Sequence, residues 1–317
     1  MYDHVCAYGR RKKDFVRELT RKCFVNGIRI KNVQHLSKKN GRNAIVFQAR
    51  TVGRSCVTAK KVVPVLTEVL RSGYYPDDSN RRIINEEYHQ YIFIQEDRFK
   101  LLSGVARMNK GKSHFNGDNF LISRLECGKA IAAIADGMGS GKRAYIESRM
   151  VIELMENCID AGFDEKASID LINSAYIAGG GTGNPVTMDM SVIDCQSGYM
   201  HCMKLGAVST FIRRDKWVEI IQSTTLPMGV LEQVDYDCTT KKLYDGDYIV
   251  MVSDGVLDNI PCVNKEERMA QMIHALTIRE PSAMAEKLLE QSLAYNDMKA
   301  SDDCTVLVLG LFDTYEK

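Results

Sequence analysis

The chain has 317 residues, of which 45% are hydrophobic and 26% charged, a balance typical of globular proteins rather than of disordered or fibrous ones. No apolar run reaches the 18 residues that a membrane-spanning helix requires, and the basic stretch 1–21 lacks the apolar centre of a secretory signal. The ten cysteines stand singly, without a Cys-x-x-Cys pair. We therefore expect a cytoplasmic protein with free thiols, and neither a disulfide framework nor a zinc site.

The net charge of +1 hides an uneven distribution, because residues 1–75 hold 17 Lys and Arg against 4 Asp and Glu, and the remainder is acidic. Either these are two solvated surfaces of opposite sign that attract each other, or a basic module meets a membrane surface or an acidic partner. Nucleic-acid binding is the less favoured prediction, because the basic region has no recognised motif and few interleaved aromatic residues.

Residues 1–98 predict a small α+β unit. Apolar residues recur at helical spacing in some segments and alternate as in strands in others. In chain order we expect a helix at 14–24, a strand at 28–33, a polar turn at 38–41, a strand at 44–52, a helix at 62–70, a loop at 74–81 and a strand at 88–95. The unit contains no chemical motif, and we expect it to be regulatory.

Residues 99–317 predict a second unit, in which clusters of strands alternate with long helices. This order favours antiparallel sheets covered by helices over alternating βαβ units. The expected strands are 129–135, 188–194, 199–205, 209–213, 248–253 and 305–312, and the expected helices are 143–159, 165–176 and 281–295. The first helix has Ile146, Met150, Leu154 and Cys158 at four-residue steps, and the last has Ala285, Leu288, Leu289 and Ser292 on one face.

Four aspartates stand where a carboxylate is costly unless it has a function. Three of them lie at the ends of predicted strands, where rigid elements can bring carboxylates to one rim of a sheet. Such like charges repel strongly unless a cation offsets them, and oxygen ligands suit Mg²⁺ or Mn²⁺. The four are Asp118 in Asn-Gly-Asp-Asn-Phe, Asp136 before Gly-Met-Gly-Ser-Gly, Asp254 before Gly255, and Asp302, which Asp303 follows.

Each aspartate also has a plainer interpretation. Asp254 with its glycine is typical of a turn, Asp118 could cap a helix or turn, and Asp302 could be a solvated loop charge. Asp136 is harder to explain in this way, because three glycines follow it within five residues. The glycine-rich stretches 137–141 and 179–183 match neither common phosphate-binding pattern, and the second is expected to be a flexible loop.

Taken in order, these motifs resemble those of PPM-type metal-dependent protein phosphatases, and more closely those of the phosphatase domain of the stage II sporulation protein E family. The resemblance covers about residues 99–313. It extends to Asn173-Ser174, Met188–Asp194, Lys204–Gly206 and Leu226–Gly229. The stretch that precedes the family's phosphatase domain is similar at Ala49–Thr51, Arg81–Asn85 and Gly104–Arg107.

The resemblance implies an α+β fold, an α-β-β-α sandwich of two antiparallel sheets flanked by helices. It implies two Mn²⁺ or Mg²⁺ ions. Asp136 would bridge both, and Asp118 with the Gly137 carbonyl would serve one of them. Asp254 and Asp302 would hold the other, with Asp303 behind the ligands. An activated water would then attack phosphorus in line, so Asp136 and Asp254 would be the catalytic residues and no covalent intermediate would form.

Met138 departs from the family pattern, because many of these phosphatases have at that place a histidine proposed as general acid. The leaving-group proton would then come from a metal-bound water or from His114, which is otherwise a surface loop residue.

The implied substrate is a phosphoserine on an anti-anti-sigma factor, whose dephosphorylation frees a sigma factor in sporulation or stress signalling. Another phosphoprotein target, and a catalytically silent pseudo-phosphatase that acts as a scaffold, are the alternatives. The resemblance is also compatible with a homodimer, and with membrane association only through a membrane region fused to or bound by this chain.

Overall fold

The structure is a computed structural model that describes residues 10–36, 42–111, 113–125, 127–178, 184–215, 217–233 and 235–314. The chain forms two compact units, of which one contains residues 1–98, 126–128 and 314–317, and the other contains residues 99–125 and 129–313. The turn expected at 38–41 and the glycine-rich loop at 179–183 lie outside the described residues. Within the described part of the chain, no helix combines the length and apolarity needed to cross a bilayer.

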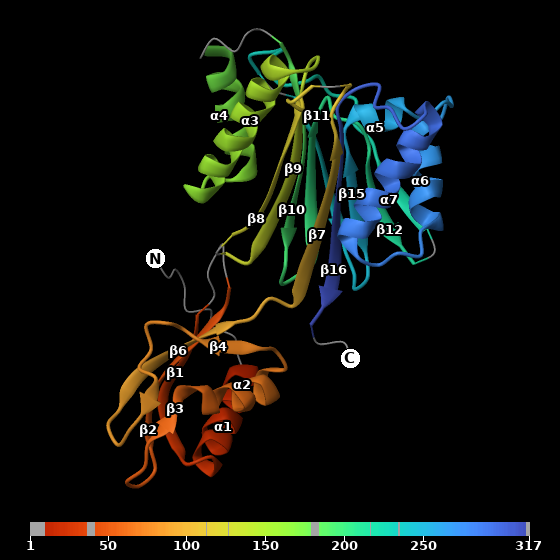
Figure 1. The fold of residues 1–317 in the computed structure, drawn as a ribbon. Coiled ribbons are helices and arrows are strands. Elements are labelled where there is room, and N and C mark those ends of the chain that lie inside the picture. Colours follow the sequence, from red (N-terminus) through yellow and green to blue (C-terminus); the bar gives the residue numbers. More distant parts are fainter. Residues whose placement is uncertain are drawn as a thin grey trace. The chain divides into compact units, whose positions relative to one another are not determined.

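The first unit packs two helices and a short 3₁₀ turn onto an antiparallel sheet (Figure 1). Phe47 and Phe93 stack in its core with ring centroids 5.3 Å apart. The sheet has the order β1 (Ile28–Leu36), β2 (Ala44–Thr51), β6 (His89–Gln95), β4 (Tyr74–Pro76), and the remaining elements are α1 (Arg10–Val25), β3 (Val57–Thr58), η1 (Ala59–Val62), α2 (Val63–Leu70) and β5 (Ile83–Ile84).

The predicted start of the loop at 74–81 was wrong, because Tyr74–Pro76 form the strand β4, which pairs with β6. β4 is an edge strand, the position in a sheet where a proline without a backbone N–H is tolerated. We predicted a loop because proline is excluded from central strands, and the sequence alone does not show that this strand lies at the edge of the sheet.

The second unit is a sandwich of two five-stranded antiparallel sheets, with α3 and α4 on one outer face and α5 to α7 on the other (Figure 1). One sheet has the order β14 (Asp237–Lys242), β11 (Tyr199–Leu205), β10 (Val186–Asp194), β9 (Lys129–Gly137), β8 (Asp118–Arg124). The other has the order β13 (Trp217–Ile221), β12 (Thr210–Arg214), β15 (Tyr248–Val252), β16 (Cys304–Asp313), β7 (Phe99–Met108). This arrangement confirms the expected α-β-β-α sandwich.

Three apolar layers hold this unit together. One lies between the two sheets and includes Ile134 and Leu309; the others lie under α3 and α4 and under α5 to α7. The helices are α3 (Lys142–Asp160), α4 (Glu165–Ala178), α5 (Asp254–Asp258), α6 (Lys265–Ala275) and α7 (Pro281–Leu293), followed by η2 (Ala294–Asn296). The face predicted for α7 is confirmed, since Ala285, Leu288, Leu289 and Ser292 are all buried.

The helix expected at 143–159 is present as α3, but of the four residues noted at four-residue steps only Cys158 is buried. Ile146 is 52% exposed, and the buried stripe instead runs through Ala144, Ser148, Val151, Met155 and Cys158. Because an α-helix has 3.6 residues per turn, a strict four-residue step drifts around its axis by about 40° at each step. The buried stripe therefore alternates steps of three and four.

A buried ion pair within the first sheet is hydrogen-bonded to the second sheet. Lys204 on β11 places its Nζ 2.5 Å from Asp189 Oδ2 on β10, and it also donates to Thr210 Oγ1 on β12 at 2.8 Å and to the Val208 carbonyl at 2.6 Å. All three ammonium donors thus have acceptors, as a fully buried lysine requires.

Candidate active site

Asp118 and Asp136 are neighbours at one end of the first sheet. Asp118 is the first residue of β8, Asp136 is the last but one of β9, and the two are partners in the antiparallel register. The plainer interpretation of Asp118 as a cap does not describe its place in a strand. Gly137 ends β9, and a Cβ there would lie 2.4 Å from the Ala144 carbonyl oxygen, so α3 packs directly against the end of this strand.

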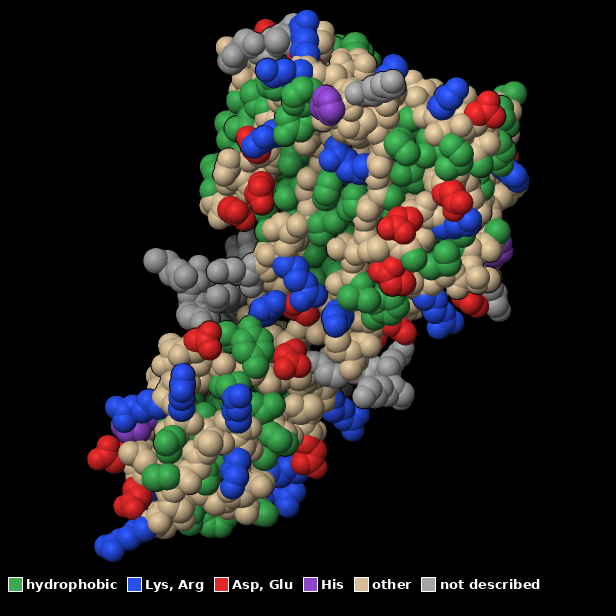
Figure 2. Space-filling model, in the orientation of Figure 1, with side chains coloured by type: hydrophobic (Ala, Val, Ile, Leu, Met, Phe, Trp, Pro, Cys, Tyr) green, Lys and Arg blue, Asp and Glu red, His purple; other side chains and the backbone are tan. Residues whose placement is uncertain are grey.

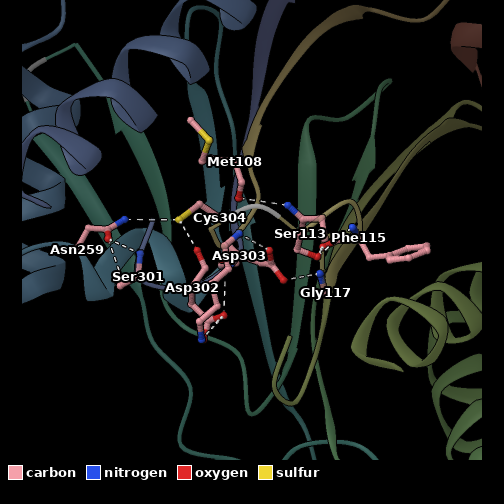
Figure 3. Close-up of polar contacts among 12 residues, drawn as sticks. Met108, Ser113, Phe115, Gly117, Asn259, Ser301, Asp302, Asp303 and Cys304 are labelled. Atoms are coloured by element: carbon pink, nitrogen blue, oxygen red, sulfur yellow. Dashed lines mark hydrogen bonds and ion pairs between the residues drawn. The ribbon is translucent and has the colours of Figure 1, made fainter. Parts of the chain in front are cut away.

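The other aspartates lie on the second sheet. Asp254 is not in a plain turn: it is the first residue of α5, immediately after β15 and Ser253. Asp302 and Asp303 precede β16, which is the neighbour of β15. Asp303 joins this sheet to the loop before β8, because its Oδ2 accepts a hydrogen bond from the Gly117 N–H at 2.7 Å (Figure 3).

Asp118 is almost completely buried and lacks hydrogen-bond partners. It is 1% exposed, and neither of its carboxylate oxygens accepts a hydrogen bond from the residues that the structure describes. Burial raises its pKa to about 7; nearby hydroxyls of Thr305 and Ser253 oppose this shift, and the charges of Asp254 and Asp303 add to it. A buried carboxylate without partners is costly unless a cation or a proton neutralises it.

Asp136 and Asp254 lie in the same electrostatic environment. Burial, together with the charges of Asp118 and Asp254, raises the pKa of Asp136 to about 10. Burial also raises the pKa of Asp254, and Asp258 and Asp302 contribute. These three carboxyl groups therefore interact closely, and their mutual repulsion favours either protonation or a bound cation.

The argument that this site suits a metal ion depends on its electrostatic environment, because its ligands are not already arranged around a metal position. The described residues contain no group of three or more His, Cys, Asp or Glu side chains already arranged to hold a metal ion. The unpartnered oxygens of Asp118 and the repulsion among Asp118, Asp136 and Asp254 are nevertheless what a hard-cation site presents when its ligands are all oxygen atoms.

Two cationic residues at this rim were not identified from the sequence. Arg107 on β7 is an exposed residue, but desolvation of its guanidinium lowers the pKa of that group, and its Nη2 donates a hydrogen bond to the Asp118 carbonyl. Lys110 places its Nζ 3.4 Å from Asp302 Oδ1. His114 is exposed, as the sequence suggested. The sequence pointed to Arg107 only as part of Gly104–Arg107, a segment that is similar to the family's sequence. Lys110 belongs to no motif that the sequence analysis identified.

Residues 127–312 match the family model of stage II sporulation protein E. The chain belongs to the stage II sporulation protein E family. The relatives include the family's protein from Bacillus subtilis (strain 168), 29% identical over 286 residues that are 90% of this chain and 34% of that protein. The protein from Priestia megaterium is 30% identical over 253 residues, 80% of this chain and 43% of that protein. The chain thus spans less than half the length of these relatives.

Solved structures support the same fold. The PP2C phosphatase domain of the Bacillus subtilis family member, with a fragment of its regulatory domain, is 27% identical, with a TM-score of 0.72 over 96% of this chain and 92% of that one. Its phosphatase domain alone is 30% identical, with a TM-score of 0.57 over 70% and 96%. RsbX in complex with magnesium is 20% identical, with a TM-score of 0.52 over 67% and 95%, and shows the fold alone. The expected family and PP2C-type phosphatase fold are therefore confirmed.

The carboxyl cluster predicts that the stability of the metal-free protein falls as pH rises. The folded-state pKa values of Asp118 (about 7) and Asp136 (about 10) lie above the ordinary 3.8. The folded state therefore binds more protons than the unfolded state, so the contribution of these two groups to stability is full below their ordinary pKa of 3.8 and is lost as the pH rises through their folded-state values. We expect the Tm with a chelator to be lower at pH 8.5 than at pH 6, and Mn²⁺ to raise it more at pH 8.5. A Tm indifferent to Mn²⁺ at both pH values would contradict a metal site here.

Proposed function

We propose that residues 99–313 form a Mn²⁺- or Mg²⁺-dependent phosphatase domain that hydrolyses phosphoserine or phosphothreonine on a regulatory protein in the cytoplasm. The observation that carries this proposal is the buried carboxyl cluster of Asp118, Asp136 and Asp254, in which neither Asp118 oxygen accepts a hydrogen bond from a residue that the structure describes. A scaffold without activity has no use for so costly a cluster.

The residues have distinct roles in this proposal. Asp136 would be shared between two cations, Asp118 and the Gly137 carbonyl would help to hold one of them, and Asp254 and Asp302 would help to hold the other. Cations bound there would supply a nucleophilic water at neutral pH and offset charge on the phosphoryl group. Asp303 holds the loop before β8 through its contact with the Gly117 N–H.

For the substrate we propose a phosphoserine on an anti-anti-sigma factor, in keeping with a sporulation family. The test is Mn²⁺-dependent release of phosphate from such a protein, with chelator-treated enzyme and a phosphotyrosine protein as controls. Hydrolysis of the phosphoserine protein alone, and only with metal, is the expected result. Failure on every phosphoserine protein under saturating Mn²⁺ would leave the scaffold as the better explanation.

His114 lies in the loop before β8 and its side chain is exposed. If metal-bound water supplies the leaving-group proton, His114→Ala leaves turnover and its pH profile nearly unchanged. A loss of about 10²-fold or more, the usual size of general-acid catalysis, would identify His114 as the acid. Single-turnover rates between pH 6 and 9 measure this.

The first unit is proposed to regulate the second through α3 and α4, because α3 begins directly after the Asp136–Gly141 segment. Gly139 and Gly141 have φ values of 94° and 84°, which side chains other than glycine rarely adopt, so the position of α3 and that of the ligand segment are linked. The Mn²⁺ concentration for half-maximal activity should differ several-fold between the full chain and a protein that starts at Phe99. Identical metal curves with identical turnover would exclude this coupling.

A further inference from the structure

The loop Asn109–Gly117 is fixed on the rim of the carboxyl cluster at both ends. Asp303 uses its two carboxylate oxygens separately: Oδ1 accepts from the Lys110 N–H at 2.8 Å and Oδ2 from the Gly117 N–H at 2.7 Å. Within the loop, Asn116 Nδ2 donates to Asn109 Oδ1 at 3.0 Å. Figure 3 shows Asp303 between the start of β16 and the loop residue Gly117. The backbone of Lys110 is therefore held in a defined place.

The Lys110 side chain extends from this fixed backbone to the solvent side of the cluster. Its Nζ lies 3.4 Å from Asp302 Oδ1, and the side chain is 44% exposed. An ammonium group has three donors, and this single long contact leaves capacity for another acceptor. An ion pair as exposed as this one adds little stability, so the fold does not depend on Lys110 remaining with Asp302.

Apart from bound cations, a phosphoryl group that approaches this rim meets mostly carboxyl groups. Asp118, Asp136 and Asp254 are close enough to shift one another's pKa values. Both cations described at the rim are exposed. Arg107 already donates to the Asp118 carbonyl and lies over the Phe120 ring, whereas the Lys110 ammonium has one long contact, to Asp302. Lys110 is thus the cation that can reach an incoming dianion with little rearrangement.

We propose that Lys110 binds a phosphoryl oxygen of the phosphoprotein substrate, an inference that rests on the proposed function. Its ammonium exchanges the 3.4 Å contact with Asp302 for a charge-assisted hydrogen bond to phosphate, which is the stronger of the two at its ordinary length of about 2.8 Å. Asp303 is then a positioning residue, because it fixes the backbone from which Lys110 extends.

The test compares Lys110→Met, which keeps most of the apolar stem and removes the charge, with Lys110→Arg, which keeps the charge. Lys287→Met is the matched control: that lysine is 43% exposed and pairs with Glu290 at 2.7 Å on α7. The readouts are KM and kcat for a phosphoserine protein, the inhibition constant of inorganic phosphate, and the thermal shift that phosphate causes in Mn²⁺-loaded protein. A Mn²⁺ thermal titration without phosphate reports metal binding separately.

For Lys110→Met we expect KM and the phosphate inhibition constant to rise about ten-fold, the size of one lost charge-assisted hydrogen bond. The Mn²⁺ midpoint should not change, Lys110→Arg should recover most of the effect, and Lys287→Met should behave as wild type. Unchanged phosphate binding in Lys110→Met would overturn the proposal. So would a shift of the Mn²⁺ midpoint alone, which would make Lys110 only a counter-ion of Asp302. If wild-type protein hydrolyses nothing, the proposed function fails, and the phosphate thermal shift still decides the role of Lys110.

Discussion

Asp136→Asn should lower phosphatase turnover by more than about 100-fold, because loss of groups that merely support metal ligands already costs 10- to 100-fold and Asp136 is proposed to bridge both cations. The metal-free variant should also melt at a higher temperature than metal-free wild type at pH 8.5. The substitution removes a buried carboxyl group whose pKa is raised to about 10 by burial and by Asp118 and Asp254. Stability and activity therefore change in opposite directions.

Asp258→Asn is the matched control, since Asp258 lies on the same short helix as Asp254, is 54% exposed and pairs with Lys265 at 2.7 Å. It should keep nearly full turnover and its response to Mn²⁺. Thermal melting with and without Mn²⁺, alongside steady-state kinetics, measures both variants. If Asp136→Asn kept more than about a tenth of wild-type turnover, the two-cation mechanism would be wrong for this protein.

Gly104→Ala should destabilise the second unit by about 3 kcal/mol, the upper end of ordinary overpacking costs. A Cβ at Gly104 on β7 would lie 2.2 Å from the backbone nitrogen of Ser282 on α7. Neither backbone can move without separating the helix from the sheet, on which α7 buries Ala285 and Leu288. Urea denaturation followed by circular dichroism measures the loss.

Gly310→Ala tests whether the cost comes from backbone contact and not from glycine replacement in general. Gly310 lies on β16, the neighbour of β7, and there the nearest atom to a new Cβ is in the Phe312 ring at 2.8 Å. A side chain can rotate away, so we expect a loss of about 1 kcal/mol. Equal losses for the two variants would contradict the close approach of α7 to β7.

The sequence predicted the parts of the site that depend on local signals. The run of small apolar residues before Asp136 indicated a buried strand, and β9 ends as expected beside that residue. Asp302 and Asp303 precede the last strand as predicted. The strand at 199–205 was also located correctly.

What the sequence could not show depends on contacts between distant segments. The pair Asp254-Gly255 suggested a turn, but it begins α5. This short helix packs on β16, α6 and α7, and these distant segments favour a helix where the local sequence favours a turn. Asp303 hydrogen-bonds the Gly117 N–H 186 positions away, and no local pattern encodes that distance. Lys110 was missed for the same reason: its significance arises only from its approach to Asp302.

The pairing of β16 with both β15 and β7 determines when the second unit can complete its fold during synthesis. β7 is the first strand of that unit and β16 the last, and their register partners, such as Val105 and Leu307, are about 200 residues apart. Until β16 leaves the ribosome, β7 has no strand beside it in the sheet and β15 has one unpaired edge. Such edges recruit other chains. A nascent chain stalled before β16 should therefore remain sensitive to protease and dependent on chaperones, even though nine of the ten strands of the sandwich have already been made.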